Sequence, residues 1–303
     1  MLLPELRIGT TGPQTTLNGV TRVCVVGSVN VDQFFRVTAL PRAGETVLAS
    51  SVATAPGGKG GNQAVAAARA GADVQFVGAV GADPAATALR AHLSANGVGL
   101  DGLEELSAAS GSAVILVDER GENMIVVAPG ANGHLTLSSA RARAVIAACE
   151  VLLVQLEVPV AAAVAAAREA RSVAATVIVN ASPVSTDPGL AELAEVTDVV
   201  IVNEAEEAHW SWPTEHFVVT RGSRGATYRG PDGTVDIPSP EVEAIDTTGA
   251  GDVFAGVLAA HWRTDRDDAL RRACAAGALA TLVAGAGDCA PRAEAISDAL
   301  TRY

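Results

Sequence analysis

The sequence predicts a three-layer α/β domain, in which helices cover both faces of a mostly parallel β-sheet and a small second β-sheet forms a lid. Two observations predict this fold class. From residue 22 onwards, short β-branched runs alternate with Ala-rich segments of helical period, which is typical of a parallel sheet. Two other stretches, residues 33–56 and 112–128, instead alternate apolar and polar side chains around turn signals.

The candidate strands of the main sheet are apolar runs bounded by Gly, Pro, Asn or Asp. In chain order they are residues 22–29, 74–80, 150–157, 175–180, 198–203 and 216–222. Helical patterns between them cover residues 62–71, 84–97 and 159–172. Because the carboxyl ends of parallel strands meet at one edge of a sheet, polar residues after these strands predict a ligand site there.

The two alternating stretches predict antiparallel strands that project from the main sheet. The turn signal DERGEN divides the second of them. The simplest place for such a lid is over the carboxyl edge of the parallel sheet, where open α/β sheets bind ligands. Residues 21–303 are then one domain with a lid, and residues 1–20 are predicted to be a flexible extension.

The composition argues against several classes of function. With 21 Lys and Arg against 34 Asp and Glu, the formal net charge of −13 disfavours a nucleic acid or an anionic membrane as partner. No apolar run is long enough for a membrane span, and no basic start precedes an apolar run as in a signal peptide. The four cysteines lack CxxC spacing, so they are interpreted as reduced thiols of a cytoplasmic protein.

The motif GSVNVD, residues 27–32, follows the first candidate strand. Asn30 and Asp32 are two residues apart, so in an extended chain they share a face, where an amide and a carboxylate could hold sugar hydroxyls. An Asx turn that ends the strand is the alternative, and this motif alone leaves it open.

The segment PGGKGGNQAVAAARAG, residues 56–71, sets a dense run of glycines before a helix. Glycine lets the backbone approach a ligand closely, while Lys59 and Asn62 supply directed donors. The run is not a Walker A loop, because Ala53 stands where that motif needs Gly and Gly60 stands where it needs Ser or Thr. Taken alone, a flexible loop before a helix explains the segment equally well.

The chain also contains a GxGxxG pattern, GVGLDG, at residues 97–102. It follows a helical pattern and not a strand, so we interpret it as a helix C-cap and turn. A Rossmann-type oxidoreductase is therefore disfavoured.

The segment DTTGAGDVFAG, residues 246–256, precedes a long Ala-rich helical pattern. If a helix begins here, the unpaired amides around Gly251 form a hollow for a phosphate, with the carboxylate of Asp252 at its rim. The positive end of the helix stabilises the negative charge of that carboxylate, which makes it a weak base. An N-capped helix with an Asp in its first turn is the structural alternative.

Three further polar residues, Glu157, Asn203 and Glu206, follow candidate strands. A lone acid after a strand is most often a solvated cap. Here polar groups follow several parallel strands, and their convergence on one edge favours a ligand site.

In this order, the motifs resemble the ribokinase branch of the PfkB carbohydrate kinase family over residues 22–303. DTTGAGDVFAG is similar to the C-terminal signature of that family, and GGKGGNQAVAAARAG to the ribokinase form of its N-terminal signature. Supporting matches are GSVNVD, PRAGETV, QLEVP, NEAE, VTRGSRGA and GAGDCAP. The resemblance implies a ribokinase-like fold and transfer of the γ-phosphate of ATP, bound with Mg²⁺, to the 5-hydroxyl of D-ribose. It also implies a homodimer formed through the lid.

The resemblance further implies roles for the residues at matching positions. Asp252 would be the catalytic base, and the amides of Gly249, Ala250 and Gly251 would hold the transferred phosphate. The sugar would be bound by Asn30, Asp32, Gly58, Lys59, Asn62, Glu157 and Asp252. The nucleotide would be bound by Asn203, Glu206, Thr220, Gly222 and Gly251, with Glu206 acting on Mg²⁺ through water. A monovalent cation, usually potassium, would be held by Asp246 and Thr248 with backbone carbonyls at Val283, Ala286 and Cys289.

The sequence departs from the family pattern at three places. Only 12 residues separate NEAE from VTRGSRG, where ribokinases usually carry an additional helix, so we expect the nucleotide side to be open or covered by another element. Cys289 replaces a small hydroxyl residue near the cation site, and Cys274 lies near the usual polar contact to adenine.

The leading hypothesis is a ribokinase, and two alternatives stay open. One is a PfkB-family kinase for deoxyribose, another sugar or a nucleoside. The other is a regulator that binds sugar or nucleotide without turnover, which the presence of Asp252, Gly249 and Gly251 disfavours because a binder needs no base.

Overall fold

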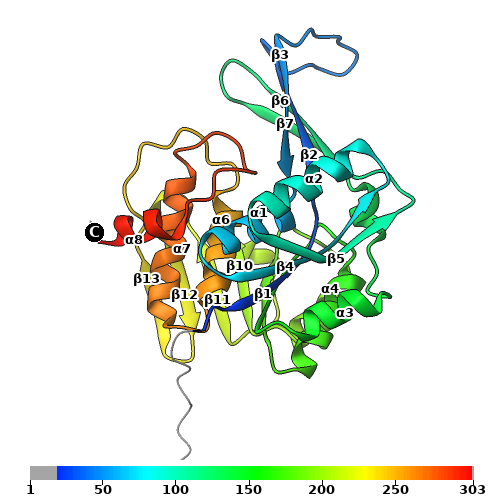
Figure 1. Cartoon of the computed structure of the whole chain (residues 1–303). Helices are drawn as coiled ribbons and strands as arrows, with labels where there is room; N and C mark the ends of the chain where they lie inside the picture. Colours follow the sequence, from blue (N-terminus) through cyan, green and yellow to red (C-terminus); the bar gives the residue numbers. More distant parts are fainter. Residues whose placement is uncertain (1–18, 302–303) are drawn as a thin grey trace, which may run out of the picture.

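A main body of three layers carries a smaller sheet that projects from it (Figure 1). The computed structural model describes residues 19–301, so the extension predicted for residues 1–20 falls almost wholly outside the described residues. Within the described part of the chain, no helix is long and apolar enough to cross a membrane.

In the described chain, the main sheet has nine strands in the order β13-β12-β11-β10-β9-β8-β1-β4-β5. The strands from β11 to β5 are parallel, and β12 and β13 extend the sheet as an antiparallel hairpin. The bounds are β1 (Arg22–Val26), β4 (Asp73–Gly81), β5 (Val98–Leu106), β8 (Val151–Gln155), β9 (Thr176–Asn180), β10 (Val199–Asn203), β11 (His216–Thr220), β12 (Ala226–Gly230) and β13 (Gly233–Ile237). The mostly parallel sheet predicted from the sequence is confirmed.

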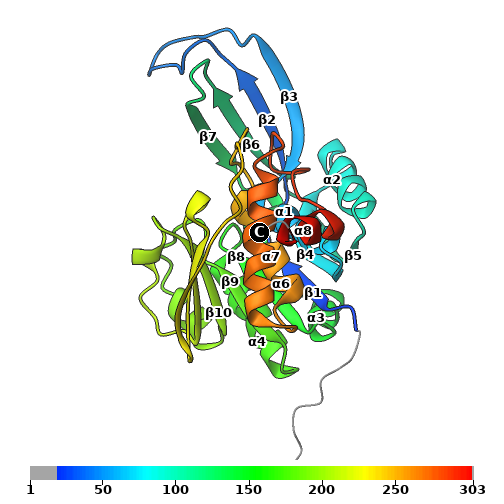
Figure 2. The ribbon, with the colours of Figure 1, turned by 90° about the vertical axis from the view of Figure 1, so that its left-hand side faces the viewer.

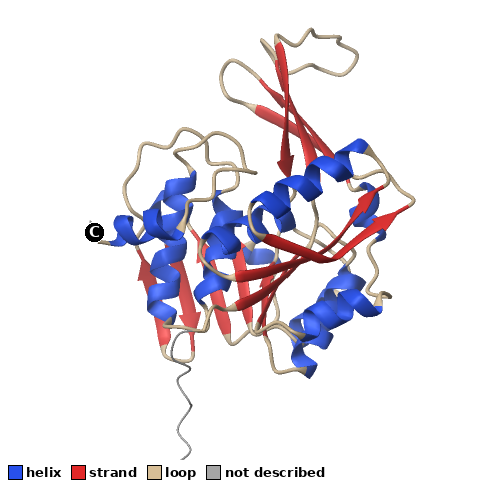
Figure 3. Cartoon of the chain, in the orientation of Figure 1, coloured by secondary structure: helices blue, strands red, loops and turns tan. Residues whose placement is uncertain are grey.

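Helices cover both faces of this sheet (Figures 2 and 3). Because successive strand residues point to opposite faces, Val23 and Val25 of β1 join one core while Cys24 and Val26 join the other. The first core packs against α1 (Lys59–Arg69), α2 (Pro84–Ala95), α6 (Ala250–His261), α7 (Arg266–Ala280) and α8 (Ala293–Leu300). The second packs against α3 (Ala140–Ala147), α4 (Val160–Ser172) and α5 (Leu190–Glu195).

The small sheet has the order β3-β2-β6-β7 among the described residues. Its strands are β2 (Asn30–Arg36), β3 (Ser51–Gly57), β6 (Gly111–Val117) and β7 (Asn123–Ala128). The pairs β2-β3 and β6-β7 are antiparallel as predicted, but β2 and β6 are parallel. That pairing corrects the prediction, since β2 and β6 follow the parallel strands β1 and β5 and both leave the carboxyl edge in the same direction.

The interpretation of residues 97–102 as a helix C-cap and turn was only partly right. Gly97 adopts φ +79° after α2, but residues 98–102 belong to the edge strand β5. A Cβ atom on Gly99 would lie 2.2 Å from Gln75 Nε2, and one on Gly102 would lie 2.4 Å from Val77 Cγ2. These two glycines therefore allow close packing of β5 against β4, and no strand-turn-helix nucleotide loop forms here.

Candidate functional site

A cavity of 440 Å³ lies between the lid and the carboxyl edge of the main sheet. The lid contributes one wall, and the first turns of α1 and α6 contribute the opposite side. Of the residues predicted from the sequence, the lining includes Asn30, Asp32, Gly58, Lys59, Asn62, Glu157, Asp246, Thr248, Gly249, Asp252 and Ala286. Residues from both ends of the chain thus meet at one cavity.

Asn30 and Asp32 lie in the lid strand β2 and not at the end of a main-sheet strand as predicted, because β1 already ends at Val26. They share one face of β2 and line the cavity. Asn30 Oδ1 accepts a hydrogen bond from Asn132 Nδ2 at 2.8 Å. Asp32 Oδ1 is shielded from solvent and has no donor among the described residues. Burial, followed by the nearby charges of Glu157 and Asp252, raises the pKa of Asp32 to about 7.

Lys59 begins α1, and the glycine before it brings this helix close to the end of β1. Gly58 has φ +84°, and a Cβ atom there would lie 2.8 Å from Val29 Cα. Glu157 Oε2 accepts hydrogen bonds from Ser28 Oγ at 2.5 Å and from the Lys59 amide at 3.1 Å. Burial alone would lower the pKa of Lys59, but the charges of Asp252, Glu157 and Glu206 outweigh it and raise that pKa. Lys59 is therefore a charged donor in the cavity.

The helix α6 begins directly at the cavity. Gly249 is its N-cap residue in the left-handed conformation, with φ +82°, and Ala250 is its first residue. The first-turn amides of Ala250 and Gly251 carry no side chain larger than a methyl group over them. Asp252 in the same turn is 8% exposed, and its Oδ2 accepts a hydrogen bond from Asn62 Nδ2 at 3.0 Å. The Ala250 amide donates to the Thr247 carbonyl at 3.3 Å. A carboxylate thus lies in the first turn of a helix whose start faces the cavity.

Two of the three buried amide side chains near Asp252, Gln63 and Gln155, were missed in the sequence, and the third, Asn180, was predicted only as the polar end of a strand. Gln63 Nε2 donates to Asp252 Oδ1 at 3.0 Å and to Asn180 Oδ1 at 2.9 Å, and Gln155 Nε2 donates to Gln63 Oε1 at 2.8 Å. A signal existed, because Gln155 and Asn180 are polar residues that end otherwise apolar strands.

Asp246 ties the turn before α6 to the loop after α7. Its Oδ1 accepts the Thr248 amide and its Oδ2 accepts the Gly285 amide, each at 2.9 Å. Burial opposes ionisation, but hydrogen bonds from Thr248 and Gly285 and the charge of Arg36 outweigh it and lower the pKa of Asp246. This carboxylate is therefore held ionised beside the cavity.

Two cation-site positions predicted in the loop after α7, Val283 and Cys289, lie outside the cavity lining. Val283 is 45% exposed, and the buried thiol of Cys289 donates to the Ala286 carbonyl at 3.3 Å. Burial raises the pKa of Cys289 to about 11, so its sulfur stays protonated. Among the residues that the structure describes, no cluster of three or more His, Cys, Asp or Glu side chains could hold a metal ion.

The predicted nucleotide residues lie outside the cavity lining. Gly251 is in the first turn of α6, and the other four lie at or just after the ends of β10 and β11. Asn203 and Glu206 bind each other reciprocally, since each backbone amide donates to the other's side chain at 2.9 Å. Thr220 Oγ1 donates to the Val202 carbonyl at 3.3 Å, and Gly222 follows with φ +58°. The charge of Glu206 also contributes to the raised pKa of Lys59, which lines the cavity.

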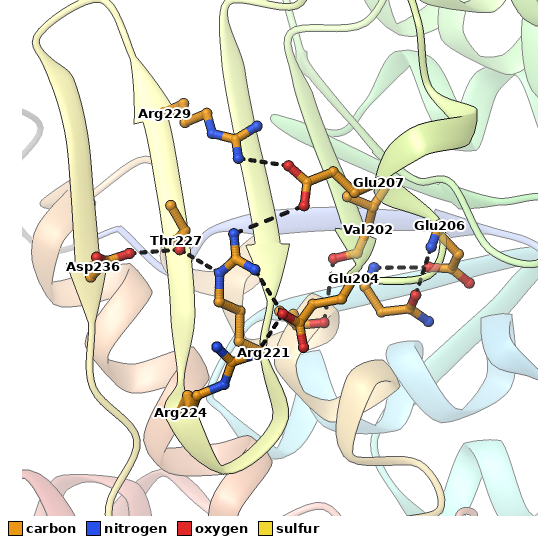
Figure 4. Close-up of polar contacts among 11 residues, drawn as sticks. Val202, Glu204, Glu206, Glu207, Arg221, Arg224, Thr227, Arg229 and Asp236 are labelled. Atoms are coloured by element: carbon orange, nitrogen blue, oxygen red, sulfur yellow. Dashed lines mark hydrogen bonds and ion pairs between the residues drawn. The ribbon is translucent and has the colours of Figure 1, made fainter.

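An ion-pair cluster joins the β10 end to the β11 end (Figure 4). Arg221 lies at its centre and contacts Glu204 Oε1 at 2.8 Å and Thr227 Oγ1 at 2.7 Å. Arg224 also pairs with Glu204, at 2.5 Å, and Arg229 pairs with Glu207 at 2.6 Å. The cluster therefore links the segment after β10, on which Glu206 lies, to Arg221, which directly follows Thr220 at the end of β11.

The short connection between β10 and β11 contains only the 3₁₀ turn η2 (Glu207–His209). Trp210 follows it, is 7% exposed, and packs into the second core with Trp212 at 5.3 Å between ring centroids. Two tryptophans therefore cover the sheet face here. Cys274 is buried in α7, with its thiol 3.8 Å from the Ile237 carbonyl.

The chain is similar to known proteins along most of its length. The profile of the family described as "pfkB family carbohydrate kinase" matches residues 20–293. Ribokinase from Bacillus subtilis (strain 168) is 37% identical over 294 residues, covering 92% of this chain and 99% of that protein. Deoxyribokinase from Salmonella typhi is 28% identical over 302 residues, covering 92% and 98%. The structure of Arabidopsis thaliana ribokinase complexed with ribose and ATP aligns with a TM-score of 0.85 at 26% identity, covering 93% and 99%.

Proposed function

Because the chain belongs to the PfkB family of carbohydrate kinases, in its ribokinase branch, we propose that it transfers the γ-phosphate of ATP to the 5-hydroxyl of D-ribose. It has the ribokinase-like fold, with a large mostly parallel sheet and a small second sheet.

One observation carries the proposal: the cavity joins unpaired hydrogen-bonding groups for a polyol to a helix N-terminus for a phosphate. Asp32 Oδ1 is buried beside the cavity without a donor, and a sugar hydroxyl is a donor that would satisfy it. Lys59 and Asn62 add charged and neutral donors to the same cavity, whose volume of 440 Å³ is within the usual range of small-molecule sites.

We propose the remaining roles from the resemblance to the family, which the position of the sugar set in the cavity lining supports. We assign the sugar to the face made by β2 and the start of α1, and the transferred phosphate to the amides of Gly249, Ala250 and Gly251. Asp252 takes the proton of the attacking hydroxyl. The sugar-binding set is Asn30, Asp32, Gly58, Lys59, Asn62, Glu157 and Asp252, and the nucleotide set is Asn203, Glu206, Thr220, Gly222 and Gly251.

Two ions accompany this proposal. Mg²⁺ bound with ATP neutralises phosphate charge, and the buried carboxylate of Glu206 fits a contact to its water shell. A monovalent cation, K⁺ in our proposal, would be held by Asp246, Thr248 and the carbonyls of Val283, Ala286 and Cys289. These residues fit a monovalent cation, because Asp246 is ionised and supplies a negative charge. The Ala286 carbonyl accepts the Cys289 thiol and keeps a second lone pair for the ion.

We also propose a homodimer through the lid and a cytoplasmic location. The lid exposes an apolar strand, β7, and the four cysteines are free and buried, which suits a reducing compartment.

A coupled assay of ADP release across pentoses, deoxyribose, hexoses and nucleosides tests the function. We expect the highest kcat/KM with D-ribose. A clear preference for deoxyribose would favour the alternative that the Salmonella typhi relative supports. Ribose binding without ADP release would instead indicate a regulator without turnover.

A further inference from the structure

Three buried amide side chains beside Asp252 have no role in the proposed sugar contacts. Gln63 and Gln155 are 0% exposed and Asn180 is 7% exposed. Gln63 lies on α1, Gln155 ends β8, and Asn180 ends β9. They meet on the side of Asp252 that faces away from the cavity, since none of them belongs to the cavity lining.

The hydrogen bonds among these amides fix the orientation of each one. Gln155 Nε2 donates to Gln63 Oε1 at 2.8 Å, which turns the Gln63 NH₂ group toward Asp252. Asn180 Nδ2 donates to the Ile201 carbonyl at 3.2 Å, which turns its oxygen toward Gln63. Gln63 Nε2 then donates to both Asn180 Oδ1 and Asp252 Oδ1, at 2.9 and 3.0 Å. Gln63 can therefore present only a donor to the carboxylate.

The two oxygens of Asp252 differ as a result. Oδ1 accepts from Gln63, which is wholly buried, whereas Oδ2 accepts from Asn62, which lines the cavity. The first oxygen is anchored in the protein interior, and the second faces the space where a sugar hydroxyl would lie.

This arrangement does not favour stability. Gln155 Oε1 is buried without a donor in the described chain, and a buried acceptor without a partner is destabilising. A glycine makes room for the amides, since a Cβ atom on Gly27 would lie 1.8 Å from Gln155 Oε1. Apolar side chains would fill this space without an unpaired group, so the amides point to a functional requirement.

We propose that Gln63, oriented by Gln155, is a positioning residue that holds Asp252 Oδ1 and thereby aims Oδ2 at the attacking hydroxyl. The inference rests on the proposed function. In that reaction the hydroxyl proton passes to Asp252 Oδ2 as its oxygen bonds to the γ-phosphorus. The bond from the γ-phosphorus to the β–γ bridging oxygen breaks, ADP leaves, and the proton is released to water.

Gln63→Met tests the role, because methionine keeps the length and removes the donor. We expect kcat to fall about tenfold or more, since a base that is misplaced by even a fraction of an ångström loses its alignment. Ribose affinity measured by calorimetry should stay unchanged. Tm should fall, because the variant removes the hydrogen-bond partner of the buried atoms Asn180 Oδ1, Asp252 Oδ1 and Gln155 Nε2. The matched control is Gln75→Met in β4, whose Oε1 is also buried without a partner, and it should leave kcat unchanged. A lower Tm with unchanged kcat in Gln63→Met would indicate a packing role and overturn the proposal.

Gln155→Met provides a second measurement if Gln63→Met does not fold. It leaves Gln63 in place but removes the donor that orients it, so kcat should fall several-fold at unchanged ribose affinity. Wild-type kcat in this folded variant would overturn the proposal. If the wild-type protein releases no ADP with any sugar, the proposed function is wrong, and this inference, which depends on it, is wrong as well. If the wild type turns over and both variants keep its kcat, the positioning role is wrong but the proposed function stands.

Discussion

Asp252 is a carboxylate in the first turn of a helix, where the helix dipole favours negative charge. This suits phosphoryl transfer through a loose transition state, because the hydroxyl loses its proton only as the new O–P bond forms. The base must then be charged, aimed and close rather than strong. The buried Gln63 amide holds Oδ1, and the cavity lies on the side of Oδ2, so that Oδ2 is directed at the cavity.

We expect Asp252→Asn to lower kcat about 100-fold or more, the range for loss of a general base, while ribose affinity stays nearly unchanged. Steady-state kinetics and calorimetry with ribose measure the two quantities. Wild-type turnover in this variant would exclude Asp252 as the base.

Asp32 gives a prediction for pH dependence. Its pKa is raised to about 7, first by burial and then by the charges of Glu157 and Asp252. Sugar hydroxyls donate to the ionised carboxylate, so ribose binding favours that form and releases a proton. Ribose affinity should therefore rise with pH through 7 and be about tenfold weaker at pH 6 than at pH 8.

Calorimetry at several pH values, in buffers of different ionisation enthalpy, measures both the affinity and the released proton. In Asp32→Asn the affinity should be weaker and lose this dependence. An affinity that stays constant between pH 6 and pH 8 in the wild type would contradict the assignment.

The first turn of α6 allows phosphate binding to be separated from folding. Gly249 has φ +82°, and a Cβ atom there would lie 2.8 Å from Ala286 Cα, whereas a Cβ atom on Gly251 would meet nothing within 4 Å. Gly249→Ala should therefore destabilise the fold by about 1–3 kcal/mol. Gly251→Ala should leave Tm unchanged or raise it, since Ala is favoured over Gly in a helix by up to about 1 kcal/mol.

Gly251→Ala should nonetheless lower kcat about tenfold or more, because its methyl group would lie beside the amides that we propose to bind the transferred phosphate. Thermal unfolding and steady-state kinetics of the two variants form a matched pair. Unchanged kcat in a stable Gly251→Ala protein would argue against an anion site at this turn.

The elements that the sequence predicts well are those whose pattern is local. The alternation of strand and helix gave the main sheet, and the polar residues after β8, β10 and β11 lie at its carboxyl edge as expected. The parallel pairing of β2 with β6 depends on where the two strands start at the edge of the main sheet. A local sequence pattern contains no information about that. The strand β5 was missed at residues 98–102 because its glycines, which pack against Gln75 and Val77, look like turn residues in the sequence.

The buried amides around Asp252 could not be predicted from a local pattern either. Gln63 lies next to Asn62 in the sequence, but its contact with Asp252 joins residues 189 positions apart and arises only when α1 packs against α6. Short motifs identified the residues that face the cavity, whereas the residues behind them depend on helix packing.

At the scale of the whole molecule, the outer face of the lid is the feature that the single chain leaves uncovered. All six residues of the edge strand β7 are exposed, and Met124 and Val126 are 44% and 64% exposed. Ile125 and Val127 of the same strand line the cavity, so Met124 and Val126 point to the opposite, outer face. There Val126 pairs with Val114, and Met124 with Leu116, which extends the apolar face across two strands. An exposed apolar edge of this kind favours association with a second copy.

We expect the wild-type protein to be a dimer in solution and Val126→Asp to be a monomer, because burying an unpaired carboxylate in an apolar interface is strongly unfavourable. Sedimentation velocity across a range of protein concentrations measures the change. The matched control is Val235→Asp, which alters a 48%-exposed valine on β13, the edge strand at the far side of the main sheet, and should leave the dimer intact. Because Val126 points away from the cavity, the variant should keep its fold and its ability to bind ribose. A wild-type monomer, or a Val126→Asp protein that remains dimeric, would mean that the lid does not form the interface.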